Sequence, residues 1–313
     1  MGNHRLFVMM FCCFGVGTAY ADLPLTVSDI LADKNRFKLD TELSYHNHQK
    51  TSATAQGFET VDLGNGRTIY LPNITESNAN TDSIIANLGL RYGVSDKLEI
   101  GIKGTGLSHH QRQQSGQNFN NTSNTQLQNI SLTTQYQTTK NHTTLPDSLI
   151  FSELSIYDNT RGLKNKSGAS ALIGATVYTV NDPIVLSLTG SYQYQAERTL
   201  TTGNRVNLGD TAMLNGSVGF AVNPDITLTG GVSIRHKWAD KTNIGKVENN
   251  HTQTALNLGL AYALSARSNL TANVRTPISG DGGSTLSVGL TTKLGELPPP
   301  LSQKYRQSTT KSQ

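Results

Sequence analysis

The stretch IIANLGLRYGVSDKLEIGIK, residues 84–103, decides the fold. Apolar side chains occupy every second position from Ile84 to Val94 and again from Leu98 to Ile102, whereas Arg91 and Glu99 fall on the other parity. Strict two-residue alternation is the signature of a β-strand with one apolar face. Because Ser95-Asp96 supplies turn residues between the two runs, the stretch predicts an antiparallel hairpin.

The same period recurs along most of the chain, in segments about as long as a tilted strand needs to cross a bilayer. The pattern predicts an all-β protein: a transmembrane, antiparallel, up-and-down β-barrel of about 12 strands. The expected strands are 37–45, 84–94, 98–103, 130–136, 149–157, 169–180, 184–195, 212–222, 226–237, 254–264, 270–278 and 286–294.

The composition of the 313 residues agrees with this prediction and excludes other classes. No apolar run past residue 25 approaches the ~18 residues that a transmembrane helix needs. The net charge of +4 is small and spread along the chain, so we expect no nucleic-acid partner. Both cysteines, Cys12 and Cys13, lie in an N-terminal apolar stretch that ends in Ala19-Tyr20-Ala21, which is typical of a cleaved signal peptide.

The connections alternate between short turns and long polar segments. Short turns are expected at residues 95–96, 181–183, 223–225 and 265–269, and long loops at 47–82 and 109–126. Outer-membrane barrels have short periplasmic turns and long outer loops. We therefore expect a signal peptide at 1–21, a periplasmic stub or plug helix at 22–36, the barrel at 37–294 and a proline-rich periplasmic tail at 295–313.

Charged residues within the strands are the main candidates for function, because a charge opposite a lipid-facing side chain must point into the lumen. They either line a water-filled path or pair in a closed interior. The lumen-lining candidates are Lys38, Asp40, Glu42, Arg91, Glu99, Lys103, Glu153, Arg235, Arg275 and Lys293.

Two further groups have expected positions. Ser28, Asp29, Ile30 and Leu31 are the candidates for a short plug helix, with Ser28 as its cap. An aromatic residue two positions before an aliphatic one recurs at strand ends, which predicts a periplasmic aromatic girdle of Tyr92, Tyr136, Tyr178, Phe220 and Tyr262. In the strand at 169–180, the alternation through Ile173 places Tyr178 on the opposite face, so a bulge there or a different strand phase is left open.

Catalytic and metal chemistry find little support in the sequence. His46, His48, His109 and His110 gather near two long loops and leave a metal site or a pH-dependent gate open, but no carboxylate stands at an obvious ligand spacing. No Ser, His and Asp arrangement suits a catalytic triad, and His142 falls in an expected turn. We expect no enzyme activity, no cofactor and no bound metal. The Gln- and Asn-rich segment 111–129 is interpreted as a solvated surface loop, with an adhesive surface as the alternative.

Two stretches carry a family resemblance. The segment LTVSDILADKNRFKLDTELSY, residues 25–45, and the hairpin LGLRYGVSDKLEIG, residues 88–101, resemble barrels of the phenol-degradation meta-pathway transporter family, which is similar to the functional-amyloid (Fap) secretion pore. The resemblance implies a twelve-stranded pore plugged by a short N-terminal helix. Trimer formation and amyloid cargo stay open, because no heptad-bearing segment stands between the signal peptide and the first strand.

The sequence as a whole predicts a channel in the bacterial cell outer membrane. A solute or a secreted polypeptide, such as an amyloid-type subunit or a small aromatic compound, would pass by diffusion. The alternative is a non-conducting structural or adhesive barrel that displays long loops. The expected partners are outer-membrane lipid, the barrel assembly machinery during biogenesis and the transported substance, and a homo-oligomer is left open. The last strand, SVGLTTKL at 287–294, resembles the assembly signal in part but has Thr292 and Leu294 where aromatic residues are usual.

Overall fold

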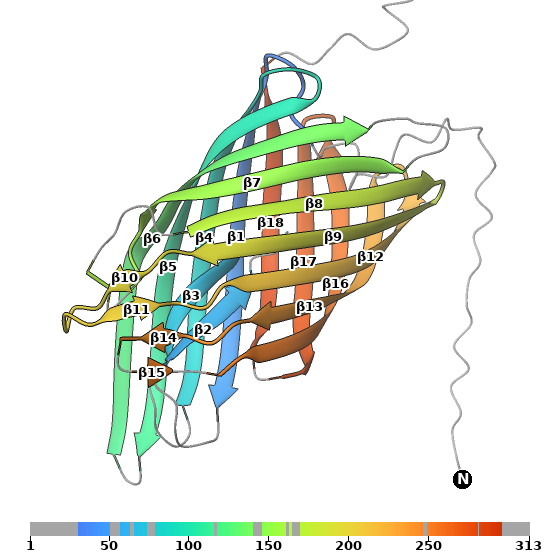
Figure 1. Ribbon diagram of the computed structural model, residues 1–313. Helices are drawn as coiled ribbons and strands as arrows, with labels where there is room; N and C mark the ends of the chain where they lie inside the picture. Colours follow the sequence, from blue (N-terminus) through green and yellow to red (C-terminus); the bar gives the residue numbers. More distant parts are fainter. Residues whose placement is uncertain are drawn as a thin grey trace, which may run out of the picture.

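In the computed structural model, twelve antiparallel strands form a closed barrel (Figure 1). The structure describes residues 31–50, 57–62, 66–73, 79–115, 118–139, 146–160, 163–164, 170–243, 245–246, 249–280 and 282–295. The barrel strands are β1 (Phe37–Lys50), β4 (Ala79–Gly93), β5 (Leu98–Ser115), β6 (Asn118–Thr139), β7 (Asp147–Asp158), β8 (Ser170–Asn181), β9 (Ile184–Gln195), β12 (Thr211–Asn223), β13 (Ile226–Lys237), β16 (His251–Ser265), β17 (Ser268–Ser279) and β18 (Ser284–Leu294).

Neighbouring strands follow the up-and-down order expected from the sequence, so the predicted fold class is confirmed. The first and last strands close the ring, with Phe37 opposite Leu294 on one side of β1 and opposite Tyr92 of β4 on the other. The short turns after β4, β8, β12 and β16 lie at one end, the periplasmic end in an outer-membrane barrel. None of the described residues form a helix long and apolar enough to cross a membrane.

The two faces of the barrel wall differ in chemistry, as the alternation predicts. Large apolar side chains face outward and are exposed, for example Leu88 at 58%, Ile173 at 59% and Leu258 at 54%. The intervening positions face the lumen, and most of them are polar, charged or small; Ile85, Leu107 and Leu172 are among the large apolar exceptions. An exposed apolar surface all around a closed barrel fits the hydrocarbon of a bilayer, and the protein is an outer-membrane barrel.

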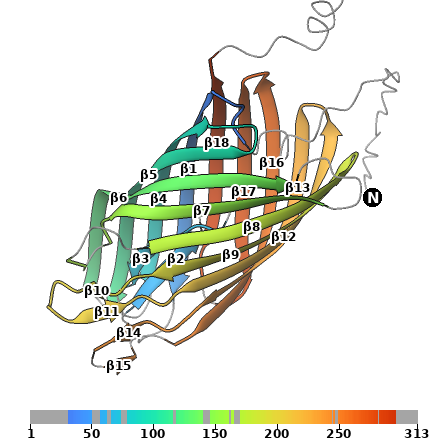
Figure 2. The ribbon, with the colours of Figure 1, turned by 45° about the horizontal axis from the view of Figure 1, so that its top comes forward.

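The segment 47–82 is not the long loop that the sequence analysis expected. β1 continues to Lys50 and β4 already begins at Ala79, because strands can extend beyond the bilayer. Between them lies a second hairpin of β2 (Gly57–Asp62) and β3 (Thr68–Asn73), which pair with each other from Gly57 opposite Asn73 to Asp62 opposite Thr68. Figures 1 and 2 show this hairpin inside the ring of barrel strands.

The expectation of a surface loop at 109–126, and of a solvated loop at 111–129, is also wrong. β5 runs on to Ser115 and β6 starts at Asn118, and the two strands pair along their whole length. They project past the other strands at the extracellular end (Figure 1). Both faces of a strand outside the membrane meet water, so its side chains need no apolar alternation.

The extracellular connections also form a small separate sheet. It contains β10 (Arg198–Thr199), β11 (Arg205–Asn207), β14 (Lys241–Thr242) and β15 (Gly245–Lys246), from the connections after β9 and after β13. Figures 1 and 2 show these short strands together at the end opposite the short turns. This sheet and the hairpin determine what remains open in the lumen.

Candidate functional site: the lumen of the barrel

All ten charged candidates lie on the inward parity of their strands. Lys38, Glu99, Lys103 and Arg235 are buried, and the other six are half-buried. Their neighbours in sequence, such as Ile100 and Ile102 beside Glu99 and Lys103, are exposed on the outer face. The structure thus places all ten charges on the inner face of the barrel, and ion pairs are formed by Asp40, Arg91, Glu99, Lys103, Glu153 and Arg275.

One group of ion pairs lies near the periplasmic end. Arg91 binds the carboxylate of Asp40 and donates from Nη1 to Glu99 Oε1 at 3.1 Å. Glu99, only 1% exposed, also accepts the backbone N–H of Ala32 at 2.5 Å. Lys38 Nζ donates to the carbonyl oxygen of Leu31. These contacts tie the segment before β1 to the lumen wall.

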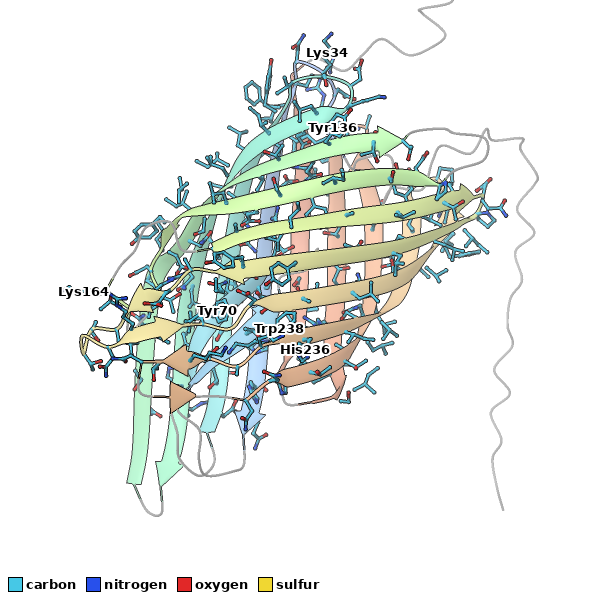
Figure 3. The ribbon with its side chains drawn as sticks, viewed as in Figure 1. Lys34, Tyr70, Tyr136, Lys164, His236 and Trp238 are labelled. Carbon is cyan, nitrogen blue, oxygen red and sulfur yellow. The ribbon has the colours of Figure 1, made fainter. Side chains whose placement is uncertain are left out.

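That segment carries the predicted plug. Ser28, Asp29 and Ile30 lie outside the described residues, whereas Leu31 and Ala32 reach the inner wall and Ala32 is 3% exposed. Asn35 N–H donates to the Gly93 carbonyl at 2.7 Å, and Lys34 forms a β-bridge with Gly93. In Figure 3, Lys34 lies at the periplasmic end of the molecule. A Cβ on Gly93 would overlap the carbonyl oxygens of Ala32 and Asp33, so glycine allows this close approach.

The β2–β3 hairpin crosses the lumen and binds walls on several sides. Asp62 pairs with Arg275 of β17 through Oδ2 and Nη1 at 2.5 Å, and the Thr60 carbonyl accepts from Arg235 of β13 at 2.7 Å. On another side, Arg67 Nε lies 2.8 Å from Glu153 Oε2 of β7.

Apolar contacts seat the hairpin as well. Val61 and Ile69, one from each hairpin strand, pack against Ile85 of β4 and Leu107 of β5, and Ile85 is fully buried. At the tip, Gly66 has φ +80°, and an added Cβ would overlap the Ser191 side chain of β9. The hairpin is thus fixed by ion pairs and by a small apolar core inside an otherwise polar lumen.

The sequence analysis missed this hairpin, although a signal for it exists. The glycines of Gly64-Asn65-Gly66 are turn residues, and they separate two short runs that contain Val61 and Ile69. Two short strands joined by such a turn form a hairpin. The sequence of these two runs and their turn does not indicate that the hairpin folds into the lumen.

A lid of extracellular connections covers the hairpin. The Tyr70 side chain packs with Leu163, Val206 and Leu208, which come from the connections after β7 and β9. The Tyr70 hydroxyl donates to the Gly209 carbonyl at 3.3 Å, and burial raises the pKa of Tyr70 well above its usual range. Figure 3 shows Tyr70 within the barrel and on the side of the small sheet.

Ion pairs hold the lid. Arg198 of β10 donates from Nη2 to Asp158 Oδ2 at 2.9 Å, and Lys237 Nζ lies 2.9 Å from Asp240 Oδ1. All four residues are largely buried, with side-chain exposure of 10% or less. Specific contacts therefore hold these extracellular connections over Tyr70 and the hairpin.

One side of the lumen carries small, uncharged polar side chains toward the periplasmic end. This wall is formed by β8, β9, β12, β13, β16 and β17. Ser187 and Ser217 hydrogen-bond at 2.6 Å, and Thr176 and Thr189 at 2.9 Å. These side chains remain partly accessible, and Asn273 is exposed. This half of the lumen is a polar vestibule that water can enter.

The four histidines of the predicted cluster do not converge. His46 Nδ1 lies 3.0 Å from Thr285 Oγ1, and His109 Nδ1 lies 3.0 Å from Ser83 Oγ. His48 is buried on the inner parity of β1, whereas His110 is on the outward parity of β5. Within the ranges that the structure describes, no three His, Cys, Asp or Glu residues are placed to hold a metal ion.

Four of the five girdle residues lie on the outward parity near the periplasmic end. Tyr136, Phe220 and Tyr262 are 40–47% exposed, and the Tyr92 ring packs at 4.8 Å from Phe37. Figure 3 shows Tyr136 toward that end. Tyr178 was assigned wrongly: it is 5% exposed, lies on the inward parity and accepts a hydrogen bond from Gln137 Nε2 at 3.0 Å. β8 pairs with both neighbours without a register shift, so no bulge occurs there.

Comparisons with known proteins agree with the fold. No protein-family model matches the chain, and no curated protein is significantly similar in sequence. Among solved structures, an outer membrane channel from Pseudomonas putida F1 has a TM-score of 0.60 at 12% identity, covering 90% of this chain and 100% of that one. The translocator domain of the autotransporter NalP from Neisseria meningitidis gives 0.46 at 12% identity, covering 86% and 92%. The CymD monoaromatic hydrocarbon channel gives 0.45 at 9% identity, covering 84% and 90%.

Proposed function

We propose that the protein is an outer-membrane channel through which small polar solutes diffuse passively. The observation that carries this proposal is the chemistry of the inner wall, where partly exposed hydroxyl and amide side chains line the vestibule behind a mainly apolar exterior. A barrel that served only as a membrane anchor would need no such wall. The ten inward charges would set the selectivity of this path.

The β2–β3 hairpin is the proposed constriction. It lies between the vestibule and the lid, and it is bound to β7, β13 and β17 through Glu153, Arg235 and Arg275. A hairpin in this place narrows the passage and would obstruct an extended polypeptide. A secreted polypeptide, including an amyloid-type subunit, is therefore the weaker candidate for cargo.

Membership of the phenol-degradation meta-pathway transporter family also remains a proposal. It is supported by the twelve-stranded barrel and by the segment before β1 that contacts the inner wall at Glu99. A small aromatic compound fits that family, but the polar vestibule favours hydroxylated or charged solutes. We also propose that the barrel assembly machinery inserts the chain, with β18 closing on β1. A homo-oligomeric state is a further proposal.

A non-conducting barrel is the second candidate, and one observation favours it. The hairpin and the lid are held by buried ion pairs, such as Arg198 with Asp158, which is what a permanently obstructed lumen requires. The barrel also has a long β5–β6 hairpin at the extracellular end, as a surface-binding barrel would.

Single-channel conductance in a planar bilayer tests the proposal. We compare the refolded mature protein, a variant that starts at Phe37, and a variant in which residues 57–73 are replaced by a short Gly-Ser linker. We expect discrete conductance steps that grow when the hairpin is removed, because the linker cannot span the lumen. If none of the three proteins conducts, although heat-modifiable gel mobility shows folded barrels, the barrel is non-conducting.

Charge reversal then tests the role of the wall. Lys38→Glu, which places a carboxylate where a buried cation contacts the Leu31 carbonyl, should shift ion selectivity toward cations. The matched control is Lys97→Glu in the exposed turn after β4, which should leave selectivity unchanged. Equal reversal potentials for both variants would remove Lys38 from the pore-lining set.

A further inference from the structure

The outer face of the lid differs in chemistry from its underside. On the underside, Leu163, Val206 and Leu208 pack with Tyr70 and are at most 6% exposed. The outer face carries exposed polar side chains, those of Lys164, Arg205, Asn207 and Lys241. These residues share one surface, because β10, β11 and β14 pair in order and the backbone N–H of Lys164 donates to the Thr199 carbonyl of β10 at 2.8 Å. We call this surface the lid face.

The lid has a local excess of positive charge. It consists of the connections 159–169, 196–210 and 238–250. They contain seven basic and four acidic residues, whereas the other extracellular connections together contain one basic and four acidic residues. An anionic group outside the barrel is therefore attracted to the lid.

The carboxylates of the lid do not cancel this excess at the lid face. Asp240 is buried against Lys237 at 2.9 Å, and Asp210 accepts a hydrogen bond from the Tyr192 hydroxyl at 2.5 Å. Glu197 lies 3.4 Å from Arg205, but both side chains are more than half exposed, so water and salt weaken this pair. Lys164 and Lys241 add two further exposed cations.

Beside the lid, the outer wall carries an aromatic cluster of Tyr192, His236 and Trp238, which we call the rim cluster. The Trp238 ring centroid lies 5.9 Å from that of Tyr192 and 4.9 Å from that of His236, in edge contacts. The backbone N–H of Trp238 donates to the Asp210 carbonyl at 3.0 Å, and His236 Nδ1 lies 2.8 Å from Thr252 Oγ1. Figure 3 shows His236 and Trp238 next to each other. These contacts fix the orientation of the three rings.

The rim cluster lies at the outer edge of the apolar band. Ile234, 46% exposed, is the last aliphatic residue on the lipid side of β13, and His236 and Trp238 occupy the next two outward positions. Aromatic side chains with a polar atom occupy the headgroup level of a membrane. In the outer leaflet of a bacterial outer membrane, this level contains the phosphorylated amino-sugars of glycolipid headgroups. Trp238 therefore meets sugar rings at this depth.

The rim cluster and the lid face are close enough to contact one headgroup. Lys241 follows Trp238 by three residues, so at most ~10 Å of chain separates them. Asn207 stands opposite Lys241 in register, and Arg205 lies on the same face of the same strand as Asn207. A sugar ring against Trp238 thus has its phosphate within reach of an ammonium and a guanidinium group, both of which bind phosphate.

We infer that the rim cluster and the lid face bind the headgroup of a phosphorylated outer-leaflet glycolipid of the lipid A class. The aromatic rings contact the sugar, and the lid cations bind its phosphates. A phospholipid has a phosphate but no sugar ring, and a neutral glycolipid has a sugar but no charge, so each matches only half of the surface. The inference concerns the outside of the barrel and is independent of conduction.

The fluorescence of Trp238 tests the inference, because it is the only tryptophan of the chain. The refolded protein is placed in phosphatidylethanolamine vesicles that contain increasing fractions of lipid A, of phosphatidylglycerol or of monogalactosyl diacylglycerol. The second lipid supplies negative charge without a sugar, and the third supplies a sugar without a phosphate. The lid variant, Arg205→Gln with Lys241→Gln, is compared with Lys97→Gln with Arg267→Gln, which removes two exposed cations from the periplasmic turns.

We expect a saturable shift of Trp238 emission with lipid A alone among the three lipids. The lid variant should raise the half-saturating fraction of lipid A about tenfold, because two charge-assisted contacts are lost, and the control variant should leave it unchanged. Native mass spectrometry tests the aromatic contact. Trp238→Leu should retain less lipid A than the unsubstituted protein, whereas Tyr136→Leu, on the outer face near the periplasmic end, should retain as much.

Three outcomes would overturn the inference: no saturable shift with lipid A, the same shift with phosphatidylglycerol at equal charge, or the same half-saturating fraction for the lid variant and its control. Heat-modifiable gel mobility shows that each variant is folded. The comparison of the three lipids uses the unsubstituted protein, so it decides the question even where a variant does not fold. Conductance is measured separately, so a non-conducting barrel leaves this test unaffected.

Discussion

The ion pair between Asp62 and Arg275 gives the sharpest test of how the hairpin is held. Asp62→Ala removes the carboxylate that pairs with Arg275 Nη1 at 2.5 Å, and the side chains of Asp62 and Arg275 are only 3% and 14% exposed. The remaining hairpin contacts, at Arg67 and at the Thr60 carbonyl, stay intact. The variant therefore weakens the docked hairpin without touching a barrel strand.

The size of the effect follows from the burial of the pair. Removing one partner of a buried ion pair costs ~3–5 kcal/mol, because the other charge is left without compensation. Arg275 borders the lumen and is not fully dry, so we take the lower end of this range. At ~1.4 kcal/mol per tenfold change, the ratio of undocked to docked hairpin should rise by about 100-fold.

Trypsin cleavage after Arg67 measures this ratio independently of any channel activity. Arg67 lies beside the hairpin turn, half-buried against Glu153 and beneath the lid, so the protease should reach it only when the hairpin leaves the wall and the lid opens. Asp62→Ala changes the first of these steps and leaves the lid contacts in place. Mass spectrometry should show cleavage at this site about 100-fold faster in Asp62→Ala. Asp62→Ala with Arg275→Ala should recover part of the loss, because no buried charge is then left alone.

The control is Glu197→Ala, which breaks an exposed pair with Arg205 at 3.4 Å, worth at most ~1 kcal/mol. It should leave cleavage after Arg67 unchanged. If Asp62→Ala is cleaved at the rate of the unsubstituted protein while gel mobility shows a folded barrel, the pair does not hold the hairpin. The reasoning about the constriction would then be wrong.

Three further substitutions probe other contacts. Gly66→Val should dislodge the hairpin tip and enlarge the conductance step, because Gly66 has φ +80° and an added side chain would overlap Ser191 of β9. An unchanged step would contradict the close contact between Gly66 and β9. Gly93→Ala should release the segment before β1, detected as faster proteolysis there with the barrel still folded, and equal proteolysis would argue against that docking. Leu258→Lys, on the lipid side, should lower the free energy of unfolding by ~2–4 kcal/mol, whereas Ser217→Lys, on the vestibule side, should cost far less in urea titrations; equal losses would reverse the assignment of faces.

The barrel itself was predictable because lipid and lumen impose opposite chemistry on alternate residues. The strands at 184–195 and 226–237 have the predicted bounds, and six others differ from prediction by at most three residues at either end. β1, β4, β5 and β6 are longer than predicted, because they continue at the extracellular end. The pattern fails where that constraint ends. Residues 118–127 of β6 stand outside the membrane, and a strand with water on both sides keeps no apolar parity.

The girdle error has a different physical origin. Tyr178 precedes Val180 and a turn just as Tyr92 precedes Val94, so the local motifs look alike. The side-chain direction depends on the parity of the whole strand, which Leu172 and Ile173 define in β8, and a local motif does not report it. The β2–β3 hairpin was not predicted for a third reason: its contacts with β7, β13 and β17 join positions far apart in the chain.

The β2–β3 hairpin forms its backbone hydrogen bonds within itself and belongs to a separate two-stranded sheet. Every contact that we describe between it and the barrel wall uses a side chain, so the ladder that closes β1 on β18 is complete whether the hairpin is present or absent. Width and chemistry of the passage can therefore change by substitutions within about seventeen residues, 57–73, while the surface that lipid meets stays the same. In such an arrangement, selection on the solute and selection on membrane insertion act on different residues of one chain.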